Sequence, residues 1–270
     1  MAEYAYWVVD AFTDRPLKGN PAAVVPLAHW PEDGWLQGIA MEMNLSETAF
    51  LVPRPAAQDA EISYDLRWFT PKLEVDLCGH ATLAAAKVLA EQGWLVDGGL
   101  VEFATRSGAL SVRRDGNDFT LDFPVVPADR AANAPMLVEA LGCQPVSIWR
   151  SKFDYLVEFS SDAVVRQLQP NLELLSRIDC RGVIVTAVDP TQSVDFISRF
   201  FAPAVGVDED PVTGSAHTTL ADFWGRRLDK QSLIGYQASA RGGWVAMQIL
   251  GSRVLLSGQA VVFAQGRFYA

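Results

Sequence analysis

The chain contains little cysteine and little histidine. Its 270 residues include three of each: Cys78, Cys143, Cys180, His29, His80 and His217. The cysteines are widely spaced and odd in number, so they predict neither a disulfide framework nor a CxxC metal pair. The histidines show no HxxxH or HxH spacing, so the sequence predicts no structural zinc site.

Positive charge and long apolar runs are also scarce. The 22 lysines and arginines stand against 32 aspartates and glutamates, which gives a net charge of −10. Without a basic patch, such a chain is a poor partner for nucleic acid. No run approaches the roughly 18–20 apolar residues of a membrane span, and residues 1–12 lack the basic and apolar regions of a signal peptide. We therefore expect a cytoplasmic protein that binds neither nucleic acid nor membranes.

Several motifs of catalysis and cofactor binding are missing as well. The sequence has no GxSxG, no GxGxxG and no phosphate loop, so it gives no support for a nucleotide cofactor. What remains is an ordinary globular composition, half hydrophobic and a fifth charged. The length fits one large domain or two of about 130 residues.

The sequence repeats itself. Residues 67–71 (RWFTP) resemble residues 199–203 (RFFAP) at an offset of 132. Gly79-His80-Ala81 then resembles Gly214-Ser215-Ala216 at an offset of 135, and similar residues continue at this offset farther along the chain. Ordered matches at nearly one offset, equal to half the chain length, predict two structurally similar halves.

Each half also predicts the same order of elements. Two strands come first, then a short helix, two or three strands, one longer apolar helix and a β-hairpin around a glycine turn. Residues 81–90 (ATLAAAKVLA) are apolar on nearly all faces, so we expect this helix to be buried. We predict an α/β (α+β) fold of two pseudo-symmetric domains, 1–123 and 124–270, each a barrel-like β-sheet around a central helix. Residues 124–135 have the composition of a crossover, and the terminal strand is allowed to cross to the first domain.

The two predicted buried helices begin at similar polar sites. Gly79-His80 precedes one helix and Gly214-Ser215 the other. The first backbone N–H groups of a helix have no partner within it and lie at the positive end of its dipole. Glycine lets a ligand approach this backbone closely. If the two starts face each other, they form a double cradle for the carboxylates of an acidic substrate.

Two acidic segments are candidates for acid–base chemistry. Asp208, Glu209 and Asp210 precede the second helix, where they either cap it or hold one carboxylate for proton transfer. Glu47 interrupts a segment bounded by apolar residues and leads into a strand-like run, where it is either a solvated turn residue or a catalytic group. Cys78 adjoins a helix start, which lowers a thiol pKa, but free cysteine is more often a small buried apolar residue.

Four segments together resemble the PhzF-like isomerases, a family named for a phenazine biosynthesis enzyme and related to diaminopimelate epimerase. They are DAFTDRPLKGNPAAVV, EMNLSETAFL, RWFTPKLEVDLCGHATLAAA and FFAPAVGVDEDPVTGSAH. The resemblance runs from about residue 6 to the end of the chain and is closest to the phenazine biosynthesis-like domain protein branch. It implies two similar α/β domains with the active site in the cleft between them, no metal, no organic cofactor, and a homodimer.

The resemblance also assigns roles to residues. It implies that Glu47 shuttles a proton on substrate carbon, together with His80 and Asp210 as catalytic residues. It implies a substrate-binding role for a further set: Asn20, Ser46, Gly79, Gly214 and Ser215. Diaminopimelate epimerase uses two cysteines, and Cys78 falls where the first would lie, but the second half offers no cysteine at the corresponding loop. A two-thiol mechanism is therefore excluded.

We accordingly expect a cofactor-independent isomerase or epimerase that moves a proton on carbon of a small carboxylic acid. The alternatives are a non-catalytic module that binds a metabolite or a protein, and a hydrolase that depends on Cys78.

Overall fold

The computed structural model describes residues 1–55, 62–131 and 134–270. It divides into two compact units, unit 1 (Met1–Asp122 and Ser257–Ala270) and unit 2 (Phe123–Leu256). Residues 257–270, which the sequence division placed with the second half, pack in unit 1 because β17 (Arg253–Tyr269) pairs with β1 (Glu3–Ala11). Residues 132 and 133 of the predicted crossover lie outside the described part of the chain.

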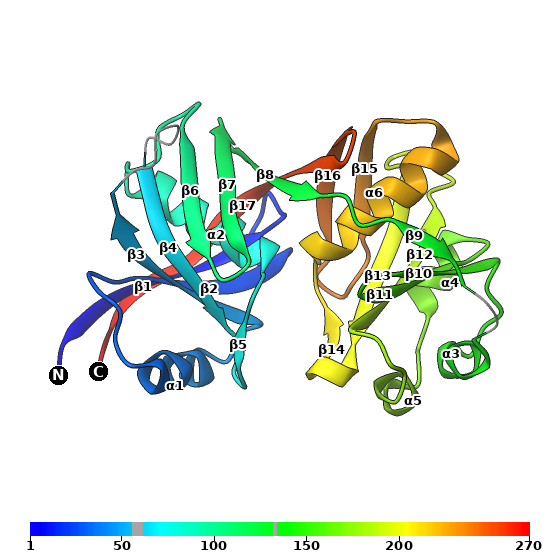
Figure 1. Ribbon diagram of the computed structural model, residues 1–270, viewed down its shortest axis with the longest axis horizontal. Helices are drawn as coiled ribbons and strands as arrows, with labels where there is room; N and C mark the ends of the chain where they lie inside the picture. Colours follow the sequence, from blue (N-terminus) through cyan, green and yellow to red (C-terminus); the bar gives the residue numbers. More distant parts are fainter. Residues whose placement is uncertain (56–61, 132–133) are drawn as a thin grey trace. The chain divides into compact units, whose positions relative to one another are not determined.

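Unit 1 is a closed barrel (Figure 1). Within the described residues its eight strands are β1 (Glu3–Ala11), β2 (Asn20–Pro26), β3 (Glu47–Arg54), β4 (Ile62–Phe69), β6 (Leu100–Thr105), β7 (Gly108–Asp115), β8 (Asp118–Pro124) and β17. Because β17 pairs with both β8 and β1, the ring closes. The short β5 (Glu74–Val75) pairs with β4 in antiparallel orientation, and α1 (Asp33–Met43) packs against β3 and β4.

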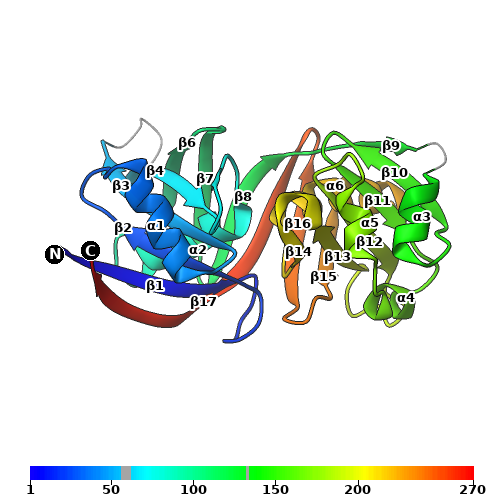
Figure 2. The ribbon, with the colours of Figure 1, turned by 90° about the horizontal axis from the view of Figure 1, so that it is seen from below.

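The central helix of unit 1 is α2 (Gly79–Glu91), and it runs inside the ring of strands (Figures 1 and 2). It contacts β1, β2, β3 and β7. All its residues from Gly79 to Ala86 are buried, as the apolar pattern predicted. Burying a side chain such as Leu83 or Leu89 contributes about 1.5–3 kcal/mol. The polar Lys87 is half-buried and pairs with Glu91 at 2.5 Å, one turn farther along.

Unit 2 is also a sheet wrapped around a helix (Figure 1). The described strands of its sheet are β9 (Ala128–Arg130), β10 (Ser147–Ser151), β11 (Asp154–Glu158), β12 (Gly182–Val188), β13 (Phe196–Ala202), β14 (Val207–Asp210), β15 (Ser232–Gln237) and β16 (Gly243–Leu250). The helix α6 (Gly214–Leu228) packs on β9, β15 and β16. The shorter described helices are α3 (Pro135–Leu141), α4 (Asp162–Gln167), α5 (Leu172–Ser176) and the 3₁₀ turn η1 (Pro203–Val205).

The strand pairings confirm the repeat. In unit 1, β1–β2, β3–β4 and β6–β7 are antiparallel, and β2–β3 and β4–β6 are parallel. In unit 2, β10–β11, β12–β13 and β15–β16 are antiparallel, and β11–β12 and β13–β15 are parallel. The two units thus share one topology.

A bidentate ion pair recurs at the same place in both units. Arg67 on β4 pairs with Glu74 on β5 through two contacts of 2.7 Å. Arg199 on β13 pairs with Glu209 on β14 through contacts of 2.7 and 2.9 Å. The repeat that was visible as a sequence offset therefore preserves a specific interaction as well as a backbone path.

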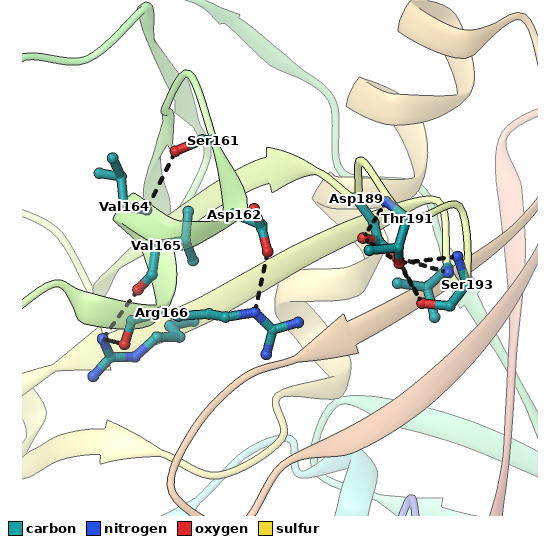
Figure 3. Close-up of polar contacts among 10 residues, drawn as sticks. Ser161, Asp162, Val164, Val165, Arg166, Asp189, Thr191 and Ser193 are labelled. Atoms are coloured by element: carbon teal, nitrogen blue, oxygen red, sulfur yellow. Dashed lines mark hydrogen bonds and ion pairs between the residues drawn. The ribbon is translucent and has the colours of Figure 1, made fainter.

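In unit 2, Arg199 also holds α4. At the beginning of α4, Ser161 Oγ accepts a hydrogen bond from the Val164 amide at 3.4 Å (Figure 3). Beyond its end, Arg199 Nη1 donates to the carbonyl oxygen of Leu168 at 2.7 Å. The turn between β12 and β13 is closed by Asp189, whose carboxylate accepts hydrogen bonds from the Thr191 and Ser193 hydroxyls.

No helix within the described residues combines the length and the apolar character needed to cross a bilayer.

His217 is a buried titratable group on α6. Its ring is fully buried, and Nδ1 donates to the Thr213 carbonyl oxygen at 2.8 Å, whereas Nε2 has no hydrogen-bond partner among the described residues. Burial disfavours the charged imidazole and lowers the pKa of His217 from 6.5 to about 4, although the hydrogen bond to Thr213 opposes this shift. Between these two values the unfolded chain binds a proton that the folded chain does not. Folding free energy is therefore lost as pH falls from 6.5 towards 4.

We predict that this loss disappears in His217→Asn. Asparagine keeps a donor for the Thr213 carbonyl oxygen but does not titrate. Between pH 7 and pH 4.5 the wild type should lose about 2 kcal/mol more unfolding free energy than the variant, measured by urea denaturation at both pH values. The exposed His29 supplies the control, since His29→Asn should keep the wild-type pH dependence. An equal loss in wild type and His217→Asn would contradict a neutral buried imidazole.

Candidate active site

A carboxylate and an imidazole meet inside unit 1. Glu47 is the first residue of β3 and His80 is the second residue of α2. Glu47 Oε2 lies 3.1 Å from His80 Nε2, and the two side chains are only 15% and 5% exposed. The pair forms because β3 neighbours β2 in the barrel and α2 packs against both strands. Glu47 is thus not the solvated turn residue that the sequence left open.

Asn20 orients the His80 ring. Its Nδ2 lies 3.1 Å from His80 Nδ1, and the other ring nitrogen, Nε2, faces Glu47 Oε2. Asn20 is buried as the first residue of β2, directly after Gly19. Gly19 has a φ of +63°, and a Cβ there would lie 2.1 Å from the Ala11 carbonyl oxygen. The GNP turn therefore requires glycine to bring Asn20 to the histidine.

Cys78 completes the cluster. Its Sγ lies 3.5 Å from His80 Nδ1 and 4.0 Å from Nε2. Burial, followed by the negative charge of Glu47, raises the pKa of the Cys78 thiol to about 11. The expectation that the helix start lowers this pKa is wrong, because loss of solvation outweighs the helix dipole at a fully buried sulfur. A neutral thiol is a weak nucleophile, which argues against a hydrolase that depends on Cys78.

The pKa of His80 is raised as well. Burial alone lowers its pKa, but the Cys78 sulfur and the Glu47 carboxylate outweigh burial and raise the pKa of His80 well above 6.5. Because the thiol is neutral, we attribute the increase mainly to the Glu47 carboxylate. The facing pair therefore favours a positive imidazole beside a negative carboxylate.

In unit 2 the corresponding helix start is organised around Asp210. This residue ends β14, and Thr213 Oγ1 donates to Asp210 Oδ2 at 2.5 Å. Gln237 at the end of β15 joins both residues: its Nε2 donates to the Asp210 carbonyl oxygen at 2.7 Å, and its Oε1 accepts from the Thr213 amide at 2.9 Å. The acidic segment does not cap α6, because Thr213 occupies the N-cap position.

Ser215 is contacted by an arginine. It is the second residue of α6, and its Oγ accepts from Arg181 Nη1 at 3.0 Å. Arg181 is fixed in turn by Asp154, whose Oδ1 accepts from Nε at 2.9 Å and whose Oδ2 contacts Nη2. Arg181, Asp154 and Gln237 were missed by the sequence reasoning. No motif marks them, and only the pairing of distant segments brings them to the helix start.

The remaining predicted residues lie near the same helix starts and strand ends. Gly79 and Gly214 are the first residues of α2 and α6, and Ser46 directly precedes Glu47. Neither Cys78 nor Thr213, the N-cap residues, caps its helix with a side-chain hydrogen bond. Both helix starts thus lack the side-chain acceptor that is common at this position.

Equivalent positions in the two units hold different side chains. Thr48 faces Phe69 across β3–β4, and Val183 faces Phe201 across β12–β13. By the repeat, Gly182 therefore occupies the position of Glu47. A Cβ at Gly182 would lie 2.3 Å from Phe200 Cζ, so that ring takes the space of a side chain. Within the described residues, unit 1 has the carboxylate–imidazole pair and unit 2 has no counterpart to it.

The fold is shared with solved structures of low sequence identity. One is a hydroxyproline epimerase from Agrobacterium vitis with bound trans-4-hydroxy-L-proline, which is 11% identical, covers 98% of this chain and 92% of its own, and has a TM-score of 0.64. At this identity the likeness shows the fold alone.

The chain belongs to the phenazine biosynthesis-like family, whose family model matches residues 9–266. An isomerase from Pseudomonas aeruginosa is 47% identical over 268 residues, 99% of each chain. The human phenazine biosynthesis-like domain-containing protein is 39% identical and covers 98% of each chain. A crystal structure of a PhzF family protein from Enterococcus faecalis is 41% identical, covers both chains fully and has a TM-score of 0.93. The predicted family is confirmed, and the chain is an enzyme of the isomerase type.

We predict that Glu47→Gln lowers the pKa of His80. The amide can still accept the hydrogen bond from Nε2, but it removes the negative charge that favours the imidazolium. The measurement is an NMR titration of the imidazole Cε1–H signals, which is simple to assign because the chain has only three histidines. The His29 and His217 signals are internal controls. An unchanged His80 titration would show that Glu47 does not control this ring.

Proposed function

We propose that this isomerase moves a proton on carbon of a small carboxylic acid, with Glu47 as the acid–base group and without an organic cofactor. The contact of 3.1 Å between Glu47 Oε2 and His80 Nε2, at a largely buried position, is the observation that carries the proposal. A carboxylate placed beside an N–H donor and shielded from water is suited to accept a proton and return it.

The proton transfer has two balanced steps. Glu47 forms an O–H bond as the substrate C–H bond breaks, and the electron pair remains on the substrate, delocalised into the adjacent acidifying group. Glu47 then returns the proton to another carbon on the same face. Inversion at one carbon instead requires a second acid, proposed to be Asp210, that supplies a proton to the opposite face while Glu47 keeps the first. His80 keeps the carboxylate in place through Nε2–H and stabilises its negative charge before and after the transfer.

Binding of the substrate carboxylate is proposed for the helix starts. Gly79 at α2 and Gly214-Ser215 at α6 present the first backbone amides of each helix, which favour an anion. Ser215 Oγ accepts a hydrogen bond from Arg181, so we propose that its own hydroxyl hydrogen is donated to a substrate oxygen. Asn20 and Ser46 are proposed to bind substrate beside Glu47, and Asp210 to handle the second proton. That both helix starts serve one substrate stays a prediction.

Two further observations agree with the substrate class. The distant epimerase relative holds a small amino acid with a free carboxylate, and another solved relative, 12% identical with a TM-score of 0.56, is a methylitaconate isomerase. The high thiol pKa of Cys78 favours this reading over a cysteine mechanism. A homodimer and a cytoplasmic location stay predictions.

We predict that Glu47→Gln abolishes exchange of the substrate C–H with solvent while the fold is kept. General acid–base groups contribute about 10²- to 10⁴-fold in rate, and a sole base should lie at the upper end. The assay is deuterium incorporation from D2O, followed by NMR, with a substrate found by a thermal-shift screen of carboxylic acids.

Cys78→Ala is the matched comparison within the same cluster. Its cost should come from packing alone and stay far below that of Glu47→Gln. If Cys78→Ala is the inactive variant and Glu47→Gln retains exchange, the thiol is the acid–base group and the carboxylate mechanism is wrong.

A further inference from the structure

We infer that Arg181 is a specificity-determining residue, which makes the start of α6 select a carboxylate and disfavour an ammonium group. This role rests on the proposed function, in which the substrate carboxylate binds at the helix starts. The new element is the side chain that sets the preference, together with the aspartate that holds it in place.

The guanidinium of Arg181 is fixed from several sides within unit 2. Asp154 Oδ1 accepts from Nε at 2.9 Å, and Oδ2 contacts Nη2. Nη1 donates to Ser215 Oγ at 3.0 Å. The guanidinium carbon also lies 5.3 Å from the ring centre of Phe153 and 5.7 Å from that of Phe200. A bidentate carboxylate and two aromatic rings hold the planar group in one orientation.

The contact with Ser215 is more than the ion pair requires. Nε and Nη2 already serve both oxygens of Asp154, whose side chain is only 1% exposed. The turn of Nη1 towards the second residue of α6 adds nothing to that pair. The side chain of Arg181 is itself 34% exposed, so its positive charge still reaches solvent beside the helix start.

This contact decides how the Ser215 hydroxyl acts. A hydroxyl has one hydrogen to donate, and here its oxygen already accepts from the arginine. The side chain is half-buried, and its hydrogen has no acceptor among the described residues. A carboxylate at this place meets a donor and a positive charge, and the helix dipole acts in the same direction. An ammonium group meets a positive charge and an oxygen that is already used.

Unit 1 shows that this pair is not required by the shared topology. By the repeat, Ser46 takes the place of Arg181. Ala22 takes that of Asp154, because each lies opposite the first residue of the neighbouring parallel strand. Neither replacement is charged, and the start of α2 is instead approached by the carboxylate of Glu47. The cation at the helix start is therefore specific to unit 2.

Acetate and ethylammonium are the probes for the test, because they are similar in size and opposite in charge. The net charge of −10 favours the cation over the surface as a whole, so a preference for acetate must come from local groups. The backbone amide signals of Gly214 and Ser215 are followed by ¹⁵N NMR at constant ionic strength. We expect acetate to shift them saturably and ethylammonium to leave them in place.

The main variant combines Arg181→Met with Asp154→Asn, which removes the cation without leaving a buried carboxylate unpaired. We expect its Kd for acetate to rise about 10-fold, the typical effect of one hydrogen bond to a charged group. Ser215→Ala should raise the Kd as well. All three substitutions together should cost less than the sum of the two effects, because the arginine acts partly through the hydroxyl.

Arg150→Met is the matched control. It removes a neighbouring arginine, whose Nη2 donates to the Asp179 carbonyl oxygen at 3.0 Å and which does not contact Ser215. Its Kd for acetate should equal that of the wild type. Amide signals that are unchanged away from α6 establish that each variant is folded.

Several outcomes would overturn the role of Arg181. They are a wild type without a saturable acetate shift or with an equal response to ethylammonium, an unchanged Kd in the main variant, an equal loss in Arg150→Met, and full additivity with Ser215→Ala. The titration involves no turnover. If it behaves as expected while Glu47→Gln keeps C–H exchange, only the proposed catalytic role of Glu47 fails. If exchange depends on Glu47 but acetate binding is indifferent to Arg181, only the role of Arg181 fails.

Discussion

The structure depends on a helix that fits inside a closed barrel. Four alanines of α2, Ala81, Ala84, Ala85 and Ala86, are fully buried against the surrounding strands. Alanine combines the highest helix propensity with the smallest side chain, so the helix forms readily and lies close to the sheet. Larger residues would overpack this interior. Because the helix is fixed along its length, its N-terminus is fixed as well, and the side chains at that end are held beside the starts of β2 and β3.

The duplication separates what the fold requires from what the chemistry requires. Both units keep the strand pairings, the central helix with glycine at its start, and the arginine–glutamate pair next to it. Where unit 1 has Glu47 and His80, unit 2 has Gly182 and Ser215, and an aromatic ring fills the space of the carboxylate. Unit 1 thus holds the pair proposed for proton transfer, while the Arg181–Ser215 contact lies at the start of α6, where an anion is proposed to bind.

Much of this was predictable from the sequence, for physical reasons that can be named. The buried helix follows from its apolar composition and the repeat from one offset, while the resemblance to a known family identified Glu47, His80 and Asn20, which the structure brings together. The sequence could not show that β17 returns to unit 1, since strand pairing across the whole chain leaves no local signal. Gln237, Arg181 and Asp154 were missed for the same reason. The pKa of Cys78 was misjudged because burial, which reverses the effect of the helix start, depends on the packed barrel.

The central claim is that Glu47 is held as a proton acceptor by the imidazole N–H of His80. Neutron diffraction from a deuterated crystal at neutral pH tests it most directly, because deuterons are located by this method. The account predicts a deuteron on His80 Nε2 that points to Glu47 Oε2, with Asn20 in contact with Nδ1. A bare Nε2, or an imidazole turned away from the carboxylate, would contradict it.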